Sequence, residues 1–359
     1  MKKVLVTGAG GPAGNNVVRS LRSADEPMRI YGTDINPFHL EYSRELLDGI
    51  FLVPRCTNED YLPRLNQVID ETGVDLVHPQ PDVEVKVISE NRERLHAKTF
   101  LPSKKTIATL QDKFESARVW EREGFPTAKA VEVRADHLEE DLRAAFDQLG
   151  NELWIRAKRG AGGTGSTPAS NPETAIHWIR YWQSRGRDWE FIAQEKLPGR
   201  NLAFQSVWNE GELVTSQARE RLEYIYPYLA PSGVTGTPVV ARTIHDERVN
   251  KMATKAVLAI DSNPTGVFCV DLKEDSQGNP VPTEINAGRF FTTSYFYTAA
   301  GLRYGRWYAN MPYLVVKLAA GDPLPGPIPK YDALPAGVYW IRHIDCGQHL
   351  LEEGEIQRA

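Results

Sequence analysis

The first third of the chain alternates short apolar runs with segments whose apolar residues recur at helical spacing. The apolar runs are rich in β-branched residues, which favours strands, and the periodic segments favour helices. We expect strands at 4–6, 30–33, 50–53 and 76–79 and helices at 15–22 and 61–71. Strands that alternate with helices predict a parallel sheet, which should end near residue 98.

The pattern changes after this first region. A helix at 107–123, ended by Gly124 and Pro126, leads into longer strands separated by glycine-rich and charged turns. We expect further strands at 130–133, 153–157, 191–194, 202–208, 213–218, 266–272, 281–285 and 338–344 and further helices at 138–149 and 247–260. The turn at 275–279 makes 266–272 and 281–285 a hairpin. This part therefore predicts an α+β region with antiparallel strands.

Composition and charge limit the classes of partner. The chain of 359 residues has 42 Lys and Arg against 47 Asp and Glu, a net charge of −5, so it lacks the positive field that favours nucleic acid or anionic membrane. Cys56, Cys269 and Cys346 are an odd number and lie far apart, which favours a reducing compartment. Apolar runs stay far below the about 18 residues of a membrane span, so we expect a cytoplasmic protein with small-molecule partners.

A first glycine cluster, Gly8 to Gly14, follows the first predicted strand and opens a helix, with Asp34 at the end of the next strand. Glycines at such a turn let backbone amides approach a pyrophosphate, and the acid accepts a ribose hydroxyl. Taken alone, this arrangement suggests a dinucleotide-binding fold and so an NAD(P)-dependent oxidoreductase. A tight strand-to-helix turn that binds no dinucleotide explains the same residues.

A second glycine cluster follows the predicted strand at 153–157. Gly160, Gly162, Gly163 and Gly165 allow the backbone to fold over phosphate oxygens, and the nearby cations neutralise them. Those cations are Arg156, Lys158 and Arg159. The cluster is not a P-loop, because no Gly-Lys-Ser/Thr follows it. A mobile surface loop is the alternative interpretation.

The predicted hairpin carries candidate metal ligands. Asp271 lies on one arm and Glu284 on the other, and Asn286 shares a strand face with Glu284 because it is two residues further on. Carboxylate and amide oxygens are the ligands that Mg²⁺ takes beside nucleotide phosphates. Arg289 follows closely and is placed to reach a transferring phosphate or a substrate carboxylate. The alternative is a solvated hairpin edge with ordinary charges.

The order of these parts resembles the ATP-grasp superfamily, most closely the synthetase half of the carbamoyl-phosphate synthase large subunit. In the resemblance Gln111-Asp112-Lys113 is similar to the Asp-Lys opening whose lysine contacts ATP, and Gln194 to Gly199 is similar to the adenine-binding hinge. The residues implied to bind ATP are Lys113, Arg156, Gly162, Gly163, Thr164, Gly165, Glu195, Lys196, Leu197 and Asn201. Asn201 stands near the family's ribose-binding acid, and Arg289 is moved by one position from the family pattern.

The resemblance implies four regions. They are a Rossmann-like preATP-grasp domain at 1–98, a small lid subdomain at 99–190, a C-terminal subdomain with the metal site at 191–325, and a linker with a terminal strand at 326–359. It also implies a reaction: Mg²⁺, with Mn²⁺ as a substitute, and ATP activate a substrate carboxylate as an acyl phosphate, which an amine or ammonia attacks. Lys158 and Arg289 are the implied catalytic residues, and a homodimer is one option. A non-catalytic nucleotide-binding protein is a further alternative beside the oxidoreductase.

Three other segments have open interpretations. Asp82 and Glu84 follow a predicted strand and are either ligands of an amine-bearing acceptor or solvated loop acids. The segment at 219–236, with Tyr224, Tyr226 and Tyr228, either lines the acceptor site or packs as a strand. The stretch at 343–349 contains His and Cys but lacks a second cluster that would complete a zinc site.

Overall fold

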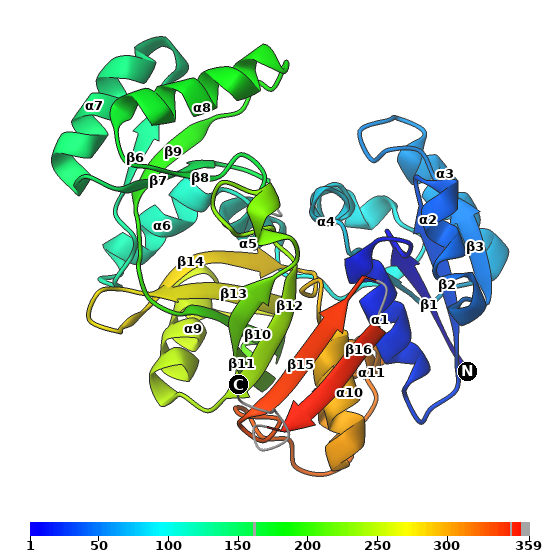
Figure 1. The fold of residues 1–359 in the computed structure, drawn as a ribbon. Coiled ribbons are helices and arrows are strands. Elements are labelled where there is room, and N and C mark those ends of the chain that lie inside the picture. Colours follow the sequence, from blue (N-terminus) through cyan, green and yellow to red (C-terminus); the bar gives the residue numbers. More distant parts are fainter. Residues whose placement is uncertain (161–162, 345–346, 353–359) are drawn as a thin grey trace.

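The apolar runs of the first region form a five-stranded parallel sheet. The computed structural model describes residues 1–160, 163–344 and 347–352 (Figure 1). The strands are β1 (Lys2–Thr7), β2 (Met28–Asp34), β3 (Gly49–Leu52), β4 (Leu76–His78) and β5 (Lys98–Thr99), in the order β3-β2-β1-β4-β5. The helices are α1 (Pro12–Arg22), α2 (Pro37–Glu41), α3 (Tyr61–Thr72) and α4 (Asp82–Glu90). The parallel sheet predicted from the alternation is confirmed.

The predicted helix at 107–123 is wrong as a single element. The chain forms two helices, α5 (Lys104–Leu110) and α6 (Lys113–Arg122). The break lies at Asp112, whose side-chain Oδ1 accepts hydrogen bonds from the backbone amides of Phe114 and Glu115, both at 3.1 Å. A carboxylate that caps a new helix start stabilises the break, because the first amides of a helix have no partner within it.

The next region forms a small lobe. Its sheet has the order β6-β9-β7-β8 and packs against two helices through an apolar cluster. The elements are β6 (Ala130–Val133), α7 (Leu138–Leu149), β7 (Leu153–Ala157), β8 (Thr167–Ala169), α8 (Pro172–Ser184) and β9 (Phe191–Glu195). Helix α8 and strand β8 were not predicted from the sequence. Strand β9 pairs with β6 and β7, so this sheet extends past the boundary expected at residue 190.

The largest sheet has seven strands in the order β14-β13-β10-β11-β12-β15-β16. Its strands are β10 (Asn201–Asn209), β11 (Glu212–Tyr224), β12 (Pro238–Ile244), β13 (Gly266–Glu274), β14 (Pro280–Ala287), β15 (Val338–His343) and β16 (Gly347–Glu352). The helices of this part are α9 (Glu247–Ile260), α10 (Tyr295–Tyr304) and α11 (Met311–Ala320). Short 3-10 helices cover Arg44–Leu46, Arg92–Arg94, Ala135–His137, Pro227–Leu229 and Trp307–Ala309. The expected antiparallel pairing is confirmed.

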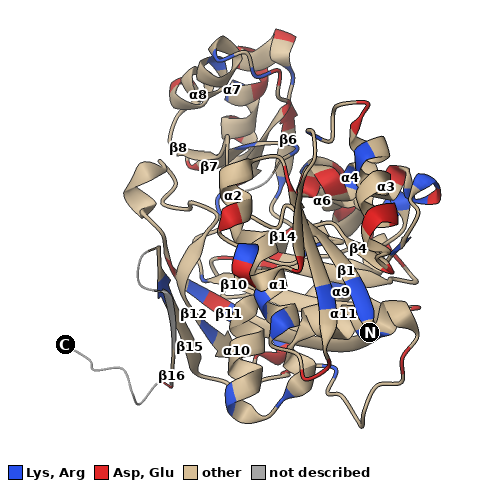
Figure 2. Ribbon diagram, turned by 90° about the vertical axis from the view of Figure 1, so that its right-hand side faces the viewer, with Lys and Arg blue, Asp and Glu red and all other residues tan. Residues whose placement is uncertain are grey.

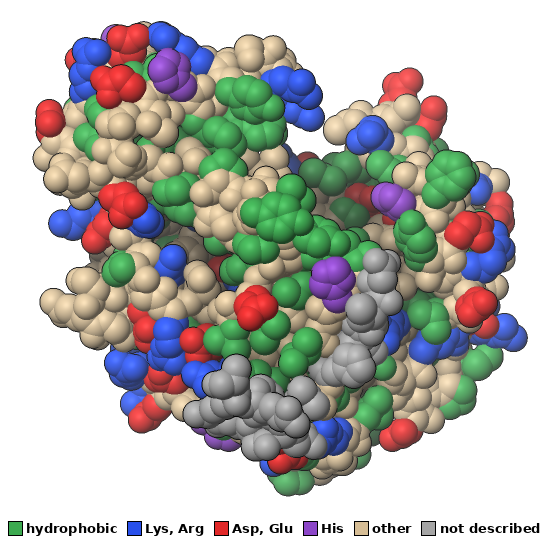
Figure 3. Space-filling view, viewed as in Figure 1, with side chains coloured by type: hydrophobic (Ala, Val, Ile, Leu, Met, Phe, Trp, Pro, Cys, Tyr) green, Lys and Arg blue, Asp and Glu red, His purple; other side chains and the backbone are tan. Residues whose placement is uncertain are grey.

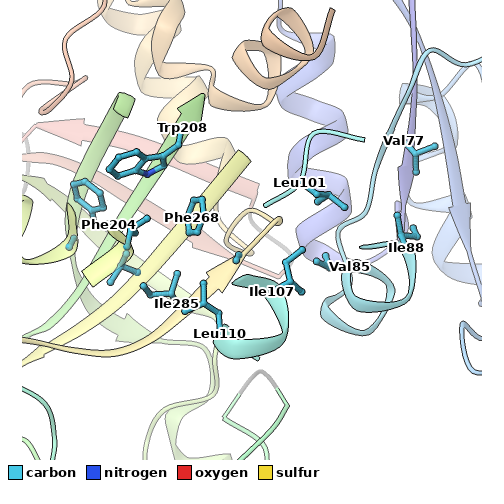
Figure 4. Close-up of a cluster of buried hydrophobic side chains, with 14 of the residues drawn as sticks. Val77, Val85, Ile88, Leu101, Ile107, Leu110, Phe204, Trp208, Phe268 and Ile285 are labelled. Carbon is cyan, nitrogen blue, oxygen red and sulfur yellow. The ribbon is translucent and has the colours of Figure 1, made fainter. Parts of the chain in front are cut away.

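Both faces of the large sheet are covered by helices, which explains why β10 is buried along nearly its whole length. Phe204 and Phe268 pack toward α9 in one cluster, whereas Ala203 and Cys269 belong to a cluster with α11 on the other face. The first cluster continues through Leu101 to residues of the first domain (Figure 4). A shared core of this kind fixes the first domain against the large sheet.

Charged residues of both signs are interspersed over the helices and strands in Figure 2. Across the described part of the chain, no helix combines the length and the apolar character needed to span a lipid bilayer.

Candidate active site

A cavity of about 460 Å³ lies where the small lobe meets the polar end of the large sheet. The surface is hollowed between the lobe of α7 and α8 and the first domain (Figure 3). This volume suits a small molecule or cofactor. Its wall contains Ala128, Trp154, Arg156, Gly163, Ser166, Gln194, Glu195, Lys196, Leu197, Asn201, Arg219, Arg221, Tyr224, Val234, Gly236, Pro238, Asp271, Leu272, Lys273, Thr283, Glu284, Asn286, Arg289, Phe291 and Thr292.

The three predicted metal ligands lie together on this wall. Asp271 on β13 is directly opposite Glu284 on β14 in the antiparallel register. The side-chain amide of Asn286 donates to Asp271 Oδ2 at 3.2 Å and to Glu284 Oε1 at 3.4 Å. The hairpin therefore points two carboxylates and one amide into the same cavity.

Arginines hold both carboxylates in the absence of a ligand. Arg221 on β11 pairs with Asp271, and Arg156 on β7 pairs with Glu284. Burial disfavours the ionised form of Asp271 and raises its pKa, although Arg221 opposes this effect. Burial acts on Glu284 in the same direction, but the charges of Arg156 and its neighbours outweigh it and lower its pKa. Glu284 therefore stays ionised, and the two acids have unlike environments.

Arg289 is held by a residue from the first domain. Its Nε donates to Asp82 Oδ1 at 3.1 Å, and its Nη2 donates to Asn286 Oδ1. Gln80 fixes the neighbouring backbone, because its side chain donates to the carbonyl of Phe290 at 2.6 Å and accepts from the Phe290 amide at 3.2 Å. Asp82 is the first residue of α4 rather than a loop residue, and its carboxylate pairs with Arg289. Its role in orienting Arg289 was not predicted.

Lys113 is the first residue of α6 and is buried. Its Nζ donates to the carbonyl of Gly160 at 2.6 Å and lies 4.0 Å from Glu284 Oε2. Burial lowers the pKa of this ammonium group, and the negative charge of Glu284 only partly offsets that effect. Lys113 thus connects the glycine segment to the acid pair.

The second glycine cluster contributes unevenly to the cavity. Gly163 lies on the wall with φ +71°. Thr164 is exposed, and Gly165 lies beside Trp189 while its carbonyl accepts a hydrogen bond from the Trp178 indole at 2.9 Å. Gly162 is outside the described residues. Neither Thr164 nor Gly165 belongs to the described cavity wall.

Lys158 is not on the described cavity wall, in contrast to the expectation. Strand β7 ends at Ala157, so the alternation that directs Arg156 into the cavity does not extend to residue 158. The ammonium group instead lies 2.6 Å from Glu132 and 3.8 Å from Asp112. Arg156 is the cation of this segment that reaches the acids.

The opposite end of the cavity is apolar. Leu197 packs with Ala128 and Val281 in a small buried cluster. Glu195, Lys196 and Asn201 line the wall beside it, and Asn201 lies opposite Arg221 and Lys273 in the sheet. The cavity therefore has one end suited to a planar apolar group and another suited to phosphates and a metal ion.

The first glycine turn is held by hydrogen bonds and close packing with neighbouring residues of the chain. Asp34 accepts hydrogen bonds from the amides of Gly10 at 3.2 Å and Asn36 at 3.0 Å. A Cβ atom at Gly14 would lie 2.1 Å from the carbonyl oxygen of Gly8, so close packing alone requires glycine there. These contacts favour a structural role for the turn over a dinucleotide site.

Glu84 is buried, with 4% of its surface exposed, and the Tyr61 hydroxyl donates to it at 2.8 Å. It is therefore not a solvated loop acid. Burial raises the pKa of this carboxyl group, and its hydrogen bonds oppose the shift only partly.

We expect Glu84→Gln to raise the melting temperature at about pH 8 and to change it little at about pH 4. A raised pKa favours folding while the acid is protonated, and this contribution is lost as the pH rises above the unfolded value of 4.5 toward the folded value. Glutamine keeps the size and hydrogen bonds of the acid without its charge. Calorimetry at both pH values checks this, with the exposed Glu93→Gln as control; a lower melting temperature at pH 8 contradicts it.

Two cavity arginines, Arg219 and Arg221, were quoted in the sequence only as part of a charged segment. Alternate positions on a long strand are a weak signal. The register across β10 places Arg219 in the row of Asp271, with Ala203 between them, and Arg221 pairs with Asp271 from the neighbouring row. In the stretch at 343–349, which contains His and Cys, residues 345–346 lie outside the described residues. The described residues contain no cluster of three or more His, Cys, Asp or Glu that would hold a metal.

No family model matches the chain. Among solved structures, similarity is found to the biotin carboxylase domain of Hydrogenobacter thermophilus 2-oxoglutarate carboxylase in complex with MgADP, ADP and bicarbonate. The TM-score is 0.70 at 17% identity over 95% of this chain and 73% of that one. N5-carboxyaminoimidazole synthetase from Staphylococcus aureus, complexed with ADP, gives a TM-score of 0.70 at 14% identity over 95% and 82%.

L-amino acid ligase from Bacillus licheniformis gives a TM-score of 0.64 at 12% identity, over 95% of this chain and 79% of that one. At these identities the likeness concerns the course of the chain and not the chemistry. The chain has the ATP-grasp fold, preceded by a Rossmann-like domain.

Proposed function

We propose that this protein is an ATP- and Mg²⁺-dependent ligase that joins a carboxylate to an amine or ammonia. The observation that carries the proposal is the acid pair Asp271 and Glu284, opposite each other and framed by cations on the wall of one cavity. The likeness to structures described with MgADP and ADP supports a nucleotide in that cavity. The γ-phosphoryl group of ATP passes to the carboxylate, and the amine then displaces phosphate.

The side chains present fit a magnesium nucleotide. Asp271, Glu284 and Asn286 supply the hard oxygen ligands, and nucleotide phosphates complete such a set. Buried Nε atoms of Arg156 and Arg221 have no hydrogen-bond partner among the described residues. Phosphate oxygens would satisfy these donors and release the carboxylates for the metal. The metal supplies charge neutralisation for the transferring phosphoryl group.

The remaining cavity residues bind and position the reactants. Lys113 and Arg156 neutralise phosphate charge, and the segment around Gly163 excludes water from the reaction. Leu197 and Ala128 receive the adenine ring, with Glu195, Lys196 and Asn201 beside it. Arg289, oriented by Asp82, faces the substrate carboxylate. Catalysis then rests on positioning and charge neutralisation, which need no covalent nucleophile.

The finer expectations remain proposals. They are the domain boundaries at residues 98 and 325, the similarity to carbamoyl-phosphate synthase, the replacement of Mg²⁺ by Mn²⁺, a homodimer, a cytoplasmic location, and partners limited to small-molecule carboxylates and amines.

Thermal unfolding with and without nucleotides tests the proposal. A ligand that binds only the folded state stabilises it by about 2.7 kcal/mol at a concentration one hundred times its Kd. We expect ATP with Mg²⁺ to raise the melting temperature and NAD(P) to leave it unchanged. Protection by NAD(P) alone would favour the oxidoreductase and contradict the ligase.

A screen of carboxylates and amines by ADP and phosphate release then tests catalysis, with mass analysis of the product. An amide formed together with ADP supports the ligase. Binding of MgATP without ADP formation across a broad panel would favour the non-catalytic nucleotide-binding protein.

A further inference from the structure

Arg219 is a buried cation on the cavity wall that lacks a counter-ion among the described residues. Its exposed fraction is 0%, and its guanidinium group lies over the rings of Phe291 at 5.1 Å and Tyr297 at 5.2 Å. Nη1 donates a long hydrogen bond of 3.4 Å to the carbonyl of Thr293, while Nε and Nη2 have no partner in the described structure. Arg221, two residues along the same strand, differs because it pairs with Asp271.

Other unsatisfied donors lie on elements that adjoin this arginine, and their residues are not on the described cavity wall. The side-chain hydroxyls of Thr293 and Ser294, the indole nitrogen of Trp340 and Nη2 of Arg342 are buried atoms without a hydrogen-bond partner in the described part of the chain. Thr293 and Ser294 precede α10, and the last two residues lie on β15. Every member of the group is able to donate a hydrogen bond.

The sheet register brings these donors to one face. Trp340 lies opposite Ala241, and Ala241 lies opposite Arg221, so Trp340, Arg342 and Arg219 project from the same side of the sheet. Trp340 packs near Tyr295, with ring centres 6.3 Å apart, next to Ser294 in the chain. Arg342 Nε donates to the carbonyl of Pro238 at 3.3 Å, and Pro238 is on the cavity wall.

This arrangement is costly unless a negative group occupies it. A buried cation without a partner carries a desolvation penalty of several kcal/mol, and each buried unpaired donor adds to it. The two arginines also repel each other: burial, and then the charges of Arg219 and Arg19, lower the pKa of Arg342 to about 10. Among the described residues no acid pairs with Arg219 or Arg342, so the missing acceptor is best supplied by a ligand.

We propose that Arg219 and Arg342, with Thr293, Ser294 and Trp340, form a subsite for a second anionic group of the acceptor substrate. This inference rests on the proposed ligase function. Strand β11 is separated from β13 by β10, about 10 Å across the sheet, and β15 lies two strands further away. Arg219 lies in the row of Asp271, with Ala203 between them, whereas Arg342 lies on β15. A group held between the two arginines is therefore on the β15 side of Arg219 and is not the carboxylate that is phosphorylated beside Asp271. The acceptor is a dianion: a dicarboxylate or a phosphorylated carboxylate.

Thermal unfolding of the full chain tests the subsite without turnover. Succinate, butyrate and inorganic phosphate are compared at equal ionic strength, each with and without MgATP. We expect succinate or phosphate to raise the melting temperature by at least about 2 °C more than butyrate does. A larger effect of succinate indicates a carboxylate, and a larger effect of phosphate indicates a phosphoryl group. Equal effects of all three probes overturn the proposal.

The variants Arg219→Met and Arg342→Met locate the effect. We expect both to lose the anion-dependent shift, and neither to melt below the wild type without ligand. Arg219→Met removes a buried charge without an ion-pair partner, and Arg342→Met removes a half-buried cation that Arg219 repels. Arg242→Met is the matched control: Arg242 lies on the opposite face of the same sheet and pairs with Glu220 at 2.9 Å. It should keep the anion shift. Unliganded destabilisation by Arg219→Met and Arg342→Met, or a retained shift, overturns the proposal.

The unfolding measurements with MgATP distinguish a failure of this inference from a failure of the proposed function. Anion and MgATP shifts should add, and MgATP should protect the Arg342 variant as it protects the wild type. If the anion and MgATP exclude each other, the anion binds in the nucleotide site. That result would contradict the proposed subsite but not the ligase function. Absence of MgATP protection in the wild type would contradict the ligase, whereas the anion shift would still test the subsite.

Discussion

Replacement of Glu284 by Gln is expected to lower the rate of ADP release with Mg²⁺ on the order of 10²- to 10³-fold. The change removes the carboxylate charge from the acid pair but keeps the side-chain volume. Glu284 is the acid that stays ionised, because the charges of Arg156, Lys113 and Arg289 outweigh the effect of burial on its pKa. On the proposed assignment, its loss would leave Mg²⁺ with Asp271 and Asn286 alone, and it leaves Arg156 without its acid.

Steady-state ADP release at saturating ATP measures this effect, and circular dichroism checks that the variant is folded. Glu274→Gln is the matched control, since Glu274 lies on the same hairpin but pairs with Arg200 at 2.6 Å. The control should turn over at nearly the wild-type rate. Normal Mg²⁺-dependent turnover of Glu284→Gln would show that the metal assignment is wrong.

Replacement of Lys113 by Met is expected to weaken MgATP binding about 10- to 100-fold, as the loss of a charged hydrogen bond does. The ammonium group is buried between the carbonyl of Gly160 and Glu284, so it is positioned where phosphate charge would lie. Methionine keeps the length of the side chain and its packing. Nucleotide affinity should therefore fall at least as much as the rate of transfer.

Calorimetric titration with ATP and Mg²⁺ gives the affinity directly. Lys104→Met is a suitable control, because Lys104 is exposed and pairs with Glu93 on the surface. An unchanged Kd for the Lys113 variant would remove this residue from the nucleotide site.

The hairpin that carries the acids shows what the local sequence pattern can predict. The turn at 275–279 and the two-residue alternation place Asp271, Glu284 and Asn286 on one face, and the structure agrees in register. Lys158 was expected to neutralise phosphate charge in the same site as Arg156, but it follows the end of β7, and its ammonium group lies beside Glu132. The position of this side chain depends on Glu132, which is distant in the sequence.

Contacts between elements that are distant in the chain could not be predicted from the sequence. Asp82 orients Arg289 across 207 positions of the chain. Arg219 has no ion-pair partner among the described residues, because Asp271, in the same row of the sheet, pairs with Arg221. Neither fact follows from the neighbours of these residues in the sequence. The sequence likewise allowed Glu84 to be a loop acid, whereas in the structure it is buried and accepts a hydrogen bond from Tyr61.

The sequence by itself determined three features: a parallel sheet followed along the chain by antiparallel strands, the hairpin with its acids, and the glycine segment beside Arg156. These features depend on periodicity and turn chemistry, which act over a few residues. Tertiary structure alone decided which cations face the acids, how Asp82 positions Arg289 and where donors remain unpaired. Such properties depend on strand order and on burial, and both arise only when segments far apart in the chain pack against each other.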